Sequence, residues 1–139
     1  MSKELEDKTN AEKILVVDDE PGMVIILSKF LTHHGYEVVT AEDGVECIAK
    51  AQSEHETLAL ILLDNLMPNM DGQTALMKLR ALNETRDIPV IIVTALSDEE
   101  DMANAQKKGA VDYIVKPFDY AVLLEKIKQT IKPKHNVFG

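Results

Sequence analysis

The sequence lacks tryptophan, has a single cysteine and contains no long apolar run. The lone Cys47 cannot form a disulfide within the chain. The first ten residues carry alternating charges instead of the apolar stretch of a secretory signal, so we expect a reducing, cytoplasmic setting. The longest apolar run, 58–63, is far shorter than the roughly 20 residues that a membrane-spanning helix needs. These absences argue against a disulfide-stabilised secreted domain and against a membrane-spanning protein.

Positive charge is also scarce. Lys and Arg number 15 against 24 Asp and Glu, which gives a formal net charge of −9. A chain with this charge repels nucleic acid and anionic membranes, so direct DNA binding is disfavoured. A phosphorylated partner would need a cation to mediate the contact. With 45% hydrophobic and 28% charged residues, the composition is otherwise that of an ordinary globular domain.

The length of 139 residues predicts one compact domain. Residues 1–12 are polar without periodicity and read as a flexible N-terminal arm, and 133–139 read as a short tail. Between them, over 13–132, short apolar runs alternate with segments of helical periodicity. The expected strands are 14–17, 37–40, 58–63, 89–94 and 111–115. The expected helices are 21–35, 44–51 or slightly beyond, 72–83, 98–108 and 121–131.

Strict alternation of strands and helices predicts an α/β fold with a parallel sheet, right-handed crossovers and helices on both faces. Strands buried on both faces explain the solid apolar runs. For five strands we expect a doubly wound sheet with strand order 2-1-3-4-5. A closed barrel would need eight such units and is excluded by length. The expected order leaves a crevice at the carboxyl ends of the first and third strands.

Polar residues follow four of the expected strands at their carboxyl ends. The first strand leads into Asp18 and Asp19, the third into Asp64, the fourth ends on Thr94 and the fifth leads into Lys116. In the expected order these strands are neighbours, so three carboxylates, a hydroxyl and an ammonium converge. Clustered carboxylates raise one another's pKa unless a cation lies between them. Magnesium suits such a site because it takes few carboxylates together with water and phosphate oxygens.

Each of these residues also has a structural explanation of its own. An Asp-Asp pair or Asp64 after a strand is common in turns and helix caps, Thr94 can cap a helix, and Lys116 can be a solvated loop lysine. Independent capping does not require all five residues at equivalent strand ends. The shared position therefore favours one common site.

The strand-end residues resemble, in order, the motifs of the response-regulator receiver domain of two-component signalling. The resemblance extends from Lys13 to about Ile131 and implies a flavodoxin-like (βα)5 fold. Any single motif is weak, whereas four at the right strand ends are strong evidence. The motifs are Asp18-Asp19-Glu20-Pro21, Asp64-Asn65-Leu66-Met67-Pro68-Asn69-Met70-Asp71-Gly72, Val93-Thr94-Ala95 and Lys116-Pro117-Phe118.

Carried over to this sequence, the resemblance implies that Asp64 takes a phosphoryl group from a phosphohistidine. The donor would be a sensor histidine kinase or a histidine phosphotransfer protein. The resemblance also implies a Mg²⁺ site ligated by Asp19, Asp64 and the backbone carbonyl of Leu66, with Asp18 assisting through a bound water.

The remaining motif residues receive roles in binding and switching. The resemblance implies that Lys116 pairs with the acceptor carboxylate before transfer and with the phosphoryl oxygens after it. It also implies a cis Lys116–Pro117 peptide, which would aim the lysine side chain into the pocket. Thr94 would donate its hydroxyl to a phosphoryl oxygen, and small Ala95 would leave room for the group. Tyr113 would swing inward with Thr94; alternatively, it is a half-buried strand aromatic without a switching role.

We therefore expect a phosphorylation-dependent switch of a protein-interaction face that catalyses only its own phosphorylation and dephosphorylation. The chain ends soon after the last helix, so we expect no output module, and the effector stays unidentified. A stand-alone receiver, a fragment of a larger regulator or hybrid kinase, and a phosphorylation-dependent homodimer all remain open. A non-phosphorylated interaction module is the alternative function.

Two enzyme-like readings fit the sequence less well. An aspartyl magnesium phosphatase would carry a second acid where this chain has Leu66, and a flavin protein would need a phosphate loop where this chain is acidic. We also expect apolar Leu66 and Leu96 to be unable to position a hydrolytic water.

Overall fold

The computed structural model describes residues 11–131, so most of the expected arm and all of the expected tail lie outside the described residues. Strands and helices alternate throughout this part of the chain. The strands are β1 (Lys13–Val17), β2 (Glu37–Ala41), β3 (Leu58–Leu63), β4 (Val90–Thr94) and β5 (Asp112–Val115). The helices are α2 (Pro21–His33), α3 (Gly44–Ser53), α4 (Gly72–Ala81), α5 (Glu99–Lys107) and α6 (Tyr120–Thr130).

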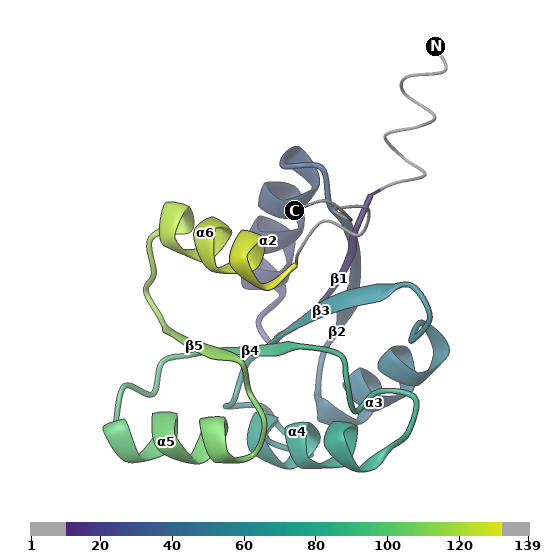
Figure 1. Ribbon diagram of the computed structural model, residues 1–139. Coiled ribbons are helices and arrows are strands. Elements are labelled where there is room, and N and C mark those ends of the chain that lie inside the picture. Colours follow the sequence, from purple (N-terminus) through teal and green to yellow (C-terminus); the bar gives the residue numbers. More distant parts are fainter. Residues whose placement is uncertain (1–10, 132–139) are drawn as a thin grey trace, which may run out of the picture.

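The five strands form one parallel sheet with the order β2-β1-β3-β4-β5. This arrangement confirms the expected doubly wound α/β fold. Helices α2 and α6 cover one face, and α3, α4 and α5 cover the other (Figure 1). The register aligns Val17 with both Ala41 and Leu63. The carboxyl ends of these strands therefore lie level at one edge of the sheet.

Side chains from each strand contribute alternately to two hydrophobic cores, one on each face of the sheet. Leu15 and Val17 of β1 pack with buried residues of α3, α4 and α5, whereas Ile14 and Val16 pack with buried residues of α2 and α6. Burial on both faces explains why the strands are continuous apolar runs. Cys47 of α3 lies fully inside the first core, where burial raises the pKa of its thiol to about 12.

Local signals set the helix boundaries. Asp43, Asp71, Asp98 and Asp119 each cap a helix by accepting a hydrogen bond from a backbone N–H of its first turn. Gly35 follows α2 with a φ of 93°, a conformation that glycine adopts without strain. Among residues 11–131, no helix combines the length and apolar character needed to cross a bilayer.

Candidate functional site

At the carboxyl edge of the sheet, the backbone hydrogen bonds between neighbouring strands continue for one residue beyond the strands. These bonds hold the backbone of the residues that follow the strands in place. The Asp18 N–H donates to the Ala41 carbonyl (3.2 Å), and the Asp64 N–H donates to the Val17 carbonyl (3.0 Å). The Lys116 N–H donates in the same way to Thr94 (2.8 Å). The side chains of these residues consequently start from rigid, adjacent points.

Three carboxylates converge at this edge. Asp18, Asp19 and Asp64 each offer an oxygen, and these oxygens lie within 4.8 Å of one another. Asp18 and Asp64 are buried, at 2% and 5% exposure, whereas Asp19 is exposed. Burial raises the pKa of Asp64, and repulsion by Asp18 adds to the rise; the nearby Lys116 opposes both effects without cancelling them. The structure thus brings together the three predicted acids.

Lys116 supplies a positive charge to the acids. Its Nζ lies 2.8 Å from Asp18 Oδ2, 3.4 Å from Asp64 Oδ2 and 3.9 Å from Glu20 Oε1. Burial lowers the pKa of Lys116, but the hydrogen bond to Asp18 and the charges of Asp64 and Asp18 outweigh it, so the pKa is raised overall. The Lys116–Pro117 peptide is cis, as the motif implied. The ammonium therefore forms ion pairs with both buried acids, and the pair with Asp18 is the shorter one.

The loop after β3 orients Asp64. Its Oδ1 accepts a hydrogen bond from the Leu66 N–H (3.2 Å). The Asn65 carbonyl accepts from the Gly72 N–H (2.9 Å), and Asn65 Oδ1 accepts from the Gln73 N–H (3.0 Å). A Cβ on Gly72 would lie 2.5 Å from the Asp64 carbonyl oxygen, so only glycine fits there. The sequence predicts no role for Asn65 in the site, and only its place inside the motif indicates one.

Thr94 and Tyr113 meet at the loop after β4. Thr94 is fully buried, and its Oγ1 accepts a long hydrogen bond from the Leu96 N–H (3.5 Å). The half-buried Tyr113 donates its hydroxyl to the Leu96 carbonyl (2.8 Å). Burial raises the pKa of Tyr113, with smaller contributions from Asp101 of α5 and from Asp98, which caps that helix. Both side chains are tied to one loop, which begins at the exposed Ala95.

The donor set fits a small divalent cation. Asp18, Asp19 and Asp64 are hard oxygen donors within 4.8 Å of one another, and with Lys116 they carry three negative charges against one positive. Magnesium favours a few carboxylates with waters and substrate oxygens completing its shell. The N–H of Leu66 bonds to Asp64, but ligation by the Leu66 carbonyl stays a prediction.

Comparison with known proteins matches this geometry to one family. The family described as "Response regulator receiver domain" matches residues 14–128. The chain belongs to the response regulator receiver domain family. Receiver domains are signalling modules of two-component systems, and the family binds magnesium in an acidic pocket.

Individual relatives agree with this membership. The "Probable transcriptional regulator ycf27" of Cyanophora paradoxa is 42% identical over 127 residues, which cover 91% of this chain and 51% of that protein. "Protein PilH" of Pseudomonas aeruginosa is 38% identical over 119 residues, covering 86% of this chain and 97% of PilH. The chain thus spans about half the length of the ycf27 relatives and nearly all of PilH.

A solved structure of the receiver domain of sensor histidine kinase PA1611 from Pseudomonas aeruginosa shares the fold. It has 30% sequence identity and a TM-score of 0.79, and the match covers 87% of this chain and 98% of that one. That structure is described with a magnesium ion coordinated in its active site cleft. The flavodoxin-like fold of this chain is therefore shared with a solved receiver domain.

Proposed function

We propose that this receiver accepts a phosphoryl group on Asp64 from the phosphohistidine of a sensor histidine kinase or a histidine phosphotransfer protein. One observation carries the proposal: a buried carboxylate lies with two further acids and one ammonium at the carboxyl edge of the sheet. Independent turn or capping roles do not require this convergence. The phosphorylated state would then change a protein-interaction face.

The transfer asks little covalent chemistry of the protein. A carboxylate oxygen of Asp64 attacks the phosphorus, the P–N bond to the donor histidine breaks, and its electron pair stays on the imidazole nitrogen. The hydrogen bond from the Leu66 N–H fixes the carboxylate, and Lys116 Nζ, 3.4 Å from Asp64 Oδ2, lies where it can neutralise phosphoryl oxygens. The domain thereby promotes only its own phosphorylation and dephosphorylation.

Asp18, Asp19, Asp64 and the carbonyl of Leu66 are the residues that would hold Mg²⁺. When bound, the ion supplies positive charge to the acids and to the equatorial phosphoryl oxygens. The charge imbalance of three carboxylates against one ammonium supports this assignment. The chain's own contribution is to hold the carboxylates in place through the extended strand ladder.

Thr94 and Tyr113 form the proposed switch, and small Ala95 leaves room for the phosphoryl group. A phosphoryl group brings negative charge and strong acceptor oxygens. The contact from the Leu96 N–H to Thr94 Oγ1 is long at 3.5 Å, so the hydroxyl is weakly held and able to turn toward a phosphoryl oxygen beside Ala95. Tyr113 is bonded to the same loop, so a shift of that loop would release or redirect the ring.

Intact-mass measurement after incubation with acetyl phosphate and Mg²⁺ tests the proposal. We expect a single phosphoryl increment that disappears with EDTA and in Asp64→Ala. The matched control Asp87→Ala, which removes an exposed carboxylate away from the site, should retain the increment. Transfer from a phosphorylated histidine phosphotransfer protein, followed by the same readout, tests the donor class.

The opposite result has a definite meaning. A folded sample that binds Mg²⁺ but gains no mass from either donor would refute phosphorylation and favour the non-phosphorylated interaction module. An increment that persists in Asp64→Ala would place the acceptor elsewhere.

A further inference from the structure

A shallow groove of about 420 Å³ lies between the first turns of α3 and the loop that connects β3 to α4. It belongs to neither the acid cluster nor the loop that holds Tyr113. Its lining combines apolar and acidic side chains. The lining residues are Glu42, Asp43, Val45, Glu46, Ala49 and Asn69.

Part of the groove lining is an apolar strip on the outer side of α3, formed by Val45 and Ala49. Val45 is 55% exposed, and Ala49, one turn later on the same face, is also exposed. Cys47 and Ala51 of the same helix point into the core. The strip is therefore not part of the sheet-facing surface of α3, and its apolar area is available to another molecule.

Carboxylates border this strip and are held in place. Asp43 Oδ1 accepts from the Glu46 N–H (2.8 Å), and Glu46 Oε1 accepts from the Glu42 N–H (2.6 Å). The bond from Glu46, and then that from Asn69, lowers the pKa of Asp43, which keeps it ionised. Within residues 11–131, no Lys or Arg forms a salt bridge with any of these three acids. Their negative charge is available to a partner.

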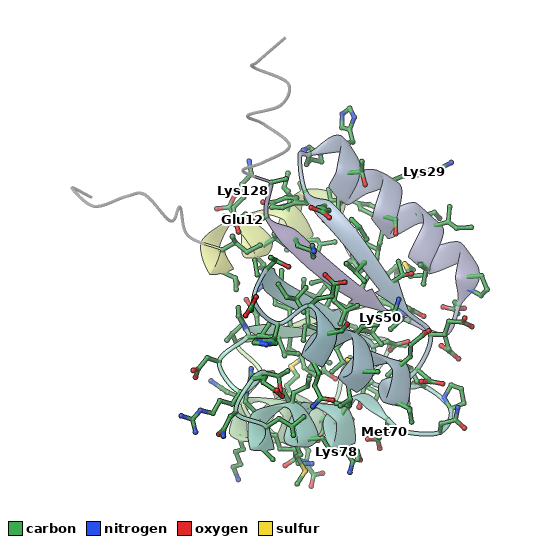
Figure 2. All side chains as sticks on the ribbon, turned by 90° about the vertical axis from the view of Figure 1, so that its right-hand side faces the viewer. Glu12, Lys29, Lys50, Met70, Lys78 and Lys128 are labelled. Carbon is green, nitrogen blue, oxygen red and sulfur yellow. The ribbon has the colours of Figure 1, made fainter. Side chains whose placement is uncertain are left out.

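The other wall is the loop that follows the proposed phosphoacceptor. Asn69, with a φ of 71°, donates from Nδ2 to Asp43 Oδ2 (3.0 Å). A Cβ on Gly44 would lie 2.7 Å from the Met70 carbonyl oxygen, so the start of α3 packs directly on the loop backbone. In Figure 2, Met70 lies at the end of the molecule toward which β1 and β2 run. The groove is thus preformed at the edge of the sheet that carries the acids.

We propose that this groove binds a basic segment of a partner protein. An apolar side chain of that segment covers Val45 and Ala49, and flanking Arg or Lys residues pair with Glu42 and Glu46. Charge complementarity selects this occupant, since three fixed carboxylates repel nucleic acid, anionic lipid and a second copy of a chain with net charge −9. Arg suits the site because its guanidinium binds a carboxylate through two parallel hydrogen bonds. Binding does not require phosphorylation.

The test is an NMR titration of the ¹⁵N-labelled chain with a peptide. Saturating Mg²⁺ is present to occupy the acid cluster of Asp18, Asp19 and Asp64, so that the basic peptide does not bind there. The probe is a short synthetic peptide of leucines separated by arginine pairs, and its control carries glutamates in place of the arginines. Glu42→Lys and Val45→Asp should each weaken binding by roughly fivefold or more. The matched controls Glu99→Lys and Met77→Asp change an exposed acid of α5 and an equally exposed apolar residue of α4, and should bind as the parent does.

The proposal is supported if chemical-shift changes are confined to residues 42–49 and the loop around Asn69, and if both groove variants bind the peptide more weakly as expected. Binding that responds equally to Glu99→Lys, or equal binding of the glutamate peptide, would overturn the proposal. Groove shifts that grow with protein concentration alone would assign the surface to a second copy and overturn it as well. Both groove variants should fold, because Glu42 precedes the helix cap and an acid at Val45 suits a helix N-terminus.

Discussion

Replacing Asp64 with asparagine should stabilise the fold in the absence of metal. Asp64 is 5% exposed, and burial followed by repulsion from Asp18 raises the pKa of its carboxyl. A carboxyl whose pKa is higher in the folded state ionises less readily there than in the unfolded chain. Ionised Asp64 therefore lowers the free energy of unfolding at neutral pH.

The distances set the size of the effect. At an effective dielectric constant of about 20, charges separated by the 4.8 Å limit of the acid cluster repel by about 3.5 kcal/mol, and solvent reduces the share of exposed Asp19. Attraction between Asp64 and Lys116 at 3.4 Å is about 5 kcal/mol on the same basis. The two effects largely offset each other. The cost of burying a carboxylate remains, so Asp64→Asn should raise the free energy of unfolding by about 1–3 kcal/mol.

Urea unfolding followed by far-UV circular dichroism at pH 7 with EDTA measures this difference, since the chain has no tryptophan for fluorescence. Glu56→Gln is the matched control, because it removes an equal charge at an exposed position. The advantage of Asp64→Asn should vanish well below pH 3.8, where the carboxyl is protonated in both states, and should be complete above the raised folded-state pKa. A variant no more stable than Glu56→Gln at pH 7 would refute the electrostatic reasoning.

Three further changes test the neighbouring loops. Leu66→Asn places an amide beside Asp64 at a position that is 52% exposed, where it can position a water. We expect the phosphoryl increment, followed by intact mass, to be lost severalfold faster than in the parent. An unchanged rate would count against the idea that the apolar Leu66 shields the phosphorylated Asp64 from water. Gly72→Ala should lower the free energy of unfolding by about 1–3 kcal/mol because its Cβ meets the Asp64 carbonyl. Gly22→Ala, with open space around it, is the control in the same urea assay, and equal effects would contradict the packing argument. Tyr113→Phe deletes the hydroxyl bond to the loop after β4 and should cost about 1 kcal/mol, so unchanged urea stability would show that the bond is not formed.

The sheet and the composition of the site could be predicted from the sequence because both follow from repetition. Five strand-helix units leave few ways to build a parallel sheet, and the carboxyl ends of parallel strands share an edge. Asp18, Asp64 and Lys116 come together for that reason alone. Strand repetition does not predict which of two neighbouring carboxylates a lysine approaches more closely. Only the structure shows that Lys116 Nζ lies closer to Asp18 than to Asp64.

Several element boundaries differ from the prediction by one or two residues, and for two of them the structure shows the physical reason. The helix expected over 72–83 ends at Ala81, because the buried Thr85 hydroxyl donates to the Leu79 carbonyl (2.6 Å) and Leu82 turns to an extended conformation. The strand expected from Val111 begins at Asp112. Val111 is apolar but 54% exposed, so hydrophobicity alone misplaced the start of the strand.

Sequence patterns gave no indication of the role of Arg80. A single arginine on a helix is normally read as solvated, yet this guanidinium donates to the carbonyls of Arg86, Ile88 and Gly109. It joins the loop after α4 to the turn before β5. Gly109, with a φ of 110°, leaves no room for a Cβ, which would lie 2.7 Å from Arg80 Nε. Such long-range clamps depend on loop geometry that periodicity does not encode.

The electrostatic cost at Asp64 and its proposed role have one physical origin. A fold that holds three carboxylates within 4.8 Å against a single ammonium keeps unbalanced negative charge at a rigid edge. Any ligand that adds positive charge there is favoured by the same interactions that disfavour ionised Asp64. Added Mg²⁺ should therefore stabilise the parent chain more than Asp64→Asn in the urea assay, because the variant has lost both the repulsion and one of the donors. If Mg²⁺ stabilised both chains equally, it would not be binding at the acid cluster. The electrostatic cost at Asp64 and its proposed role would then have no common origin.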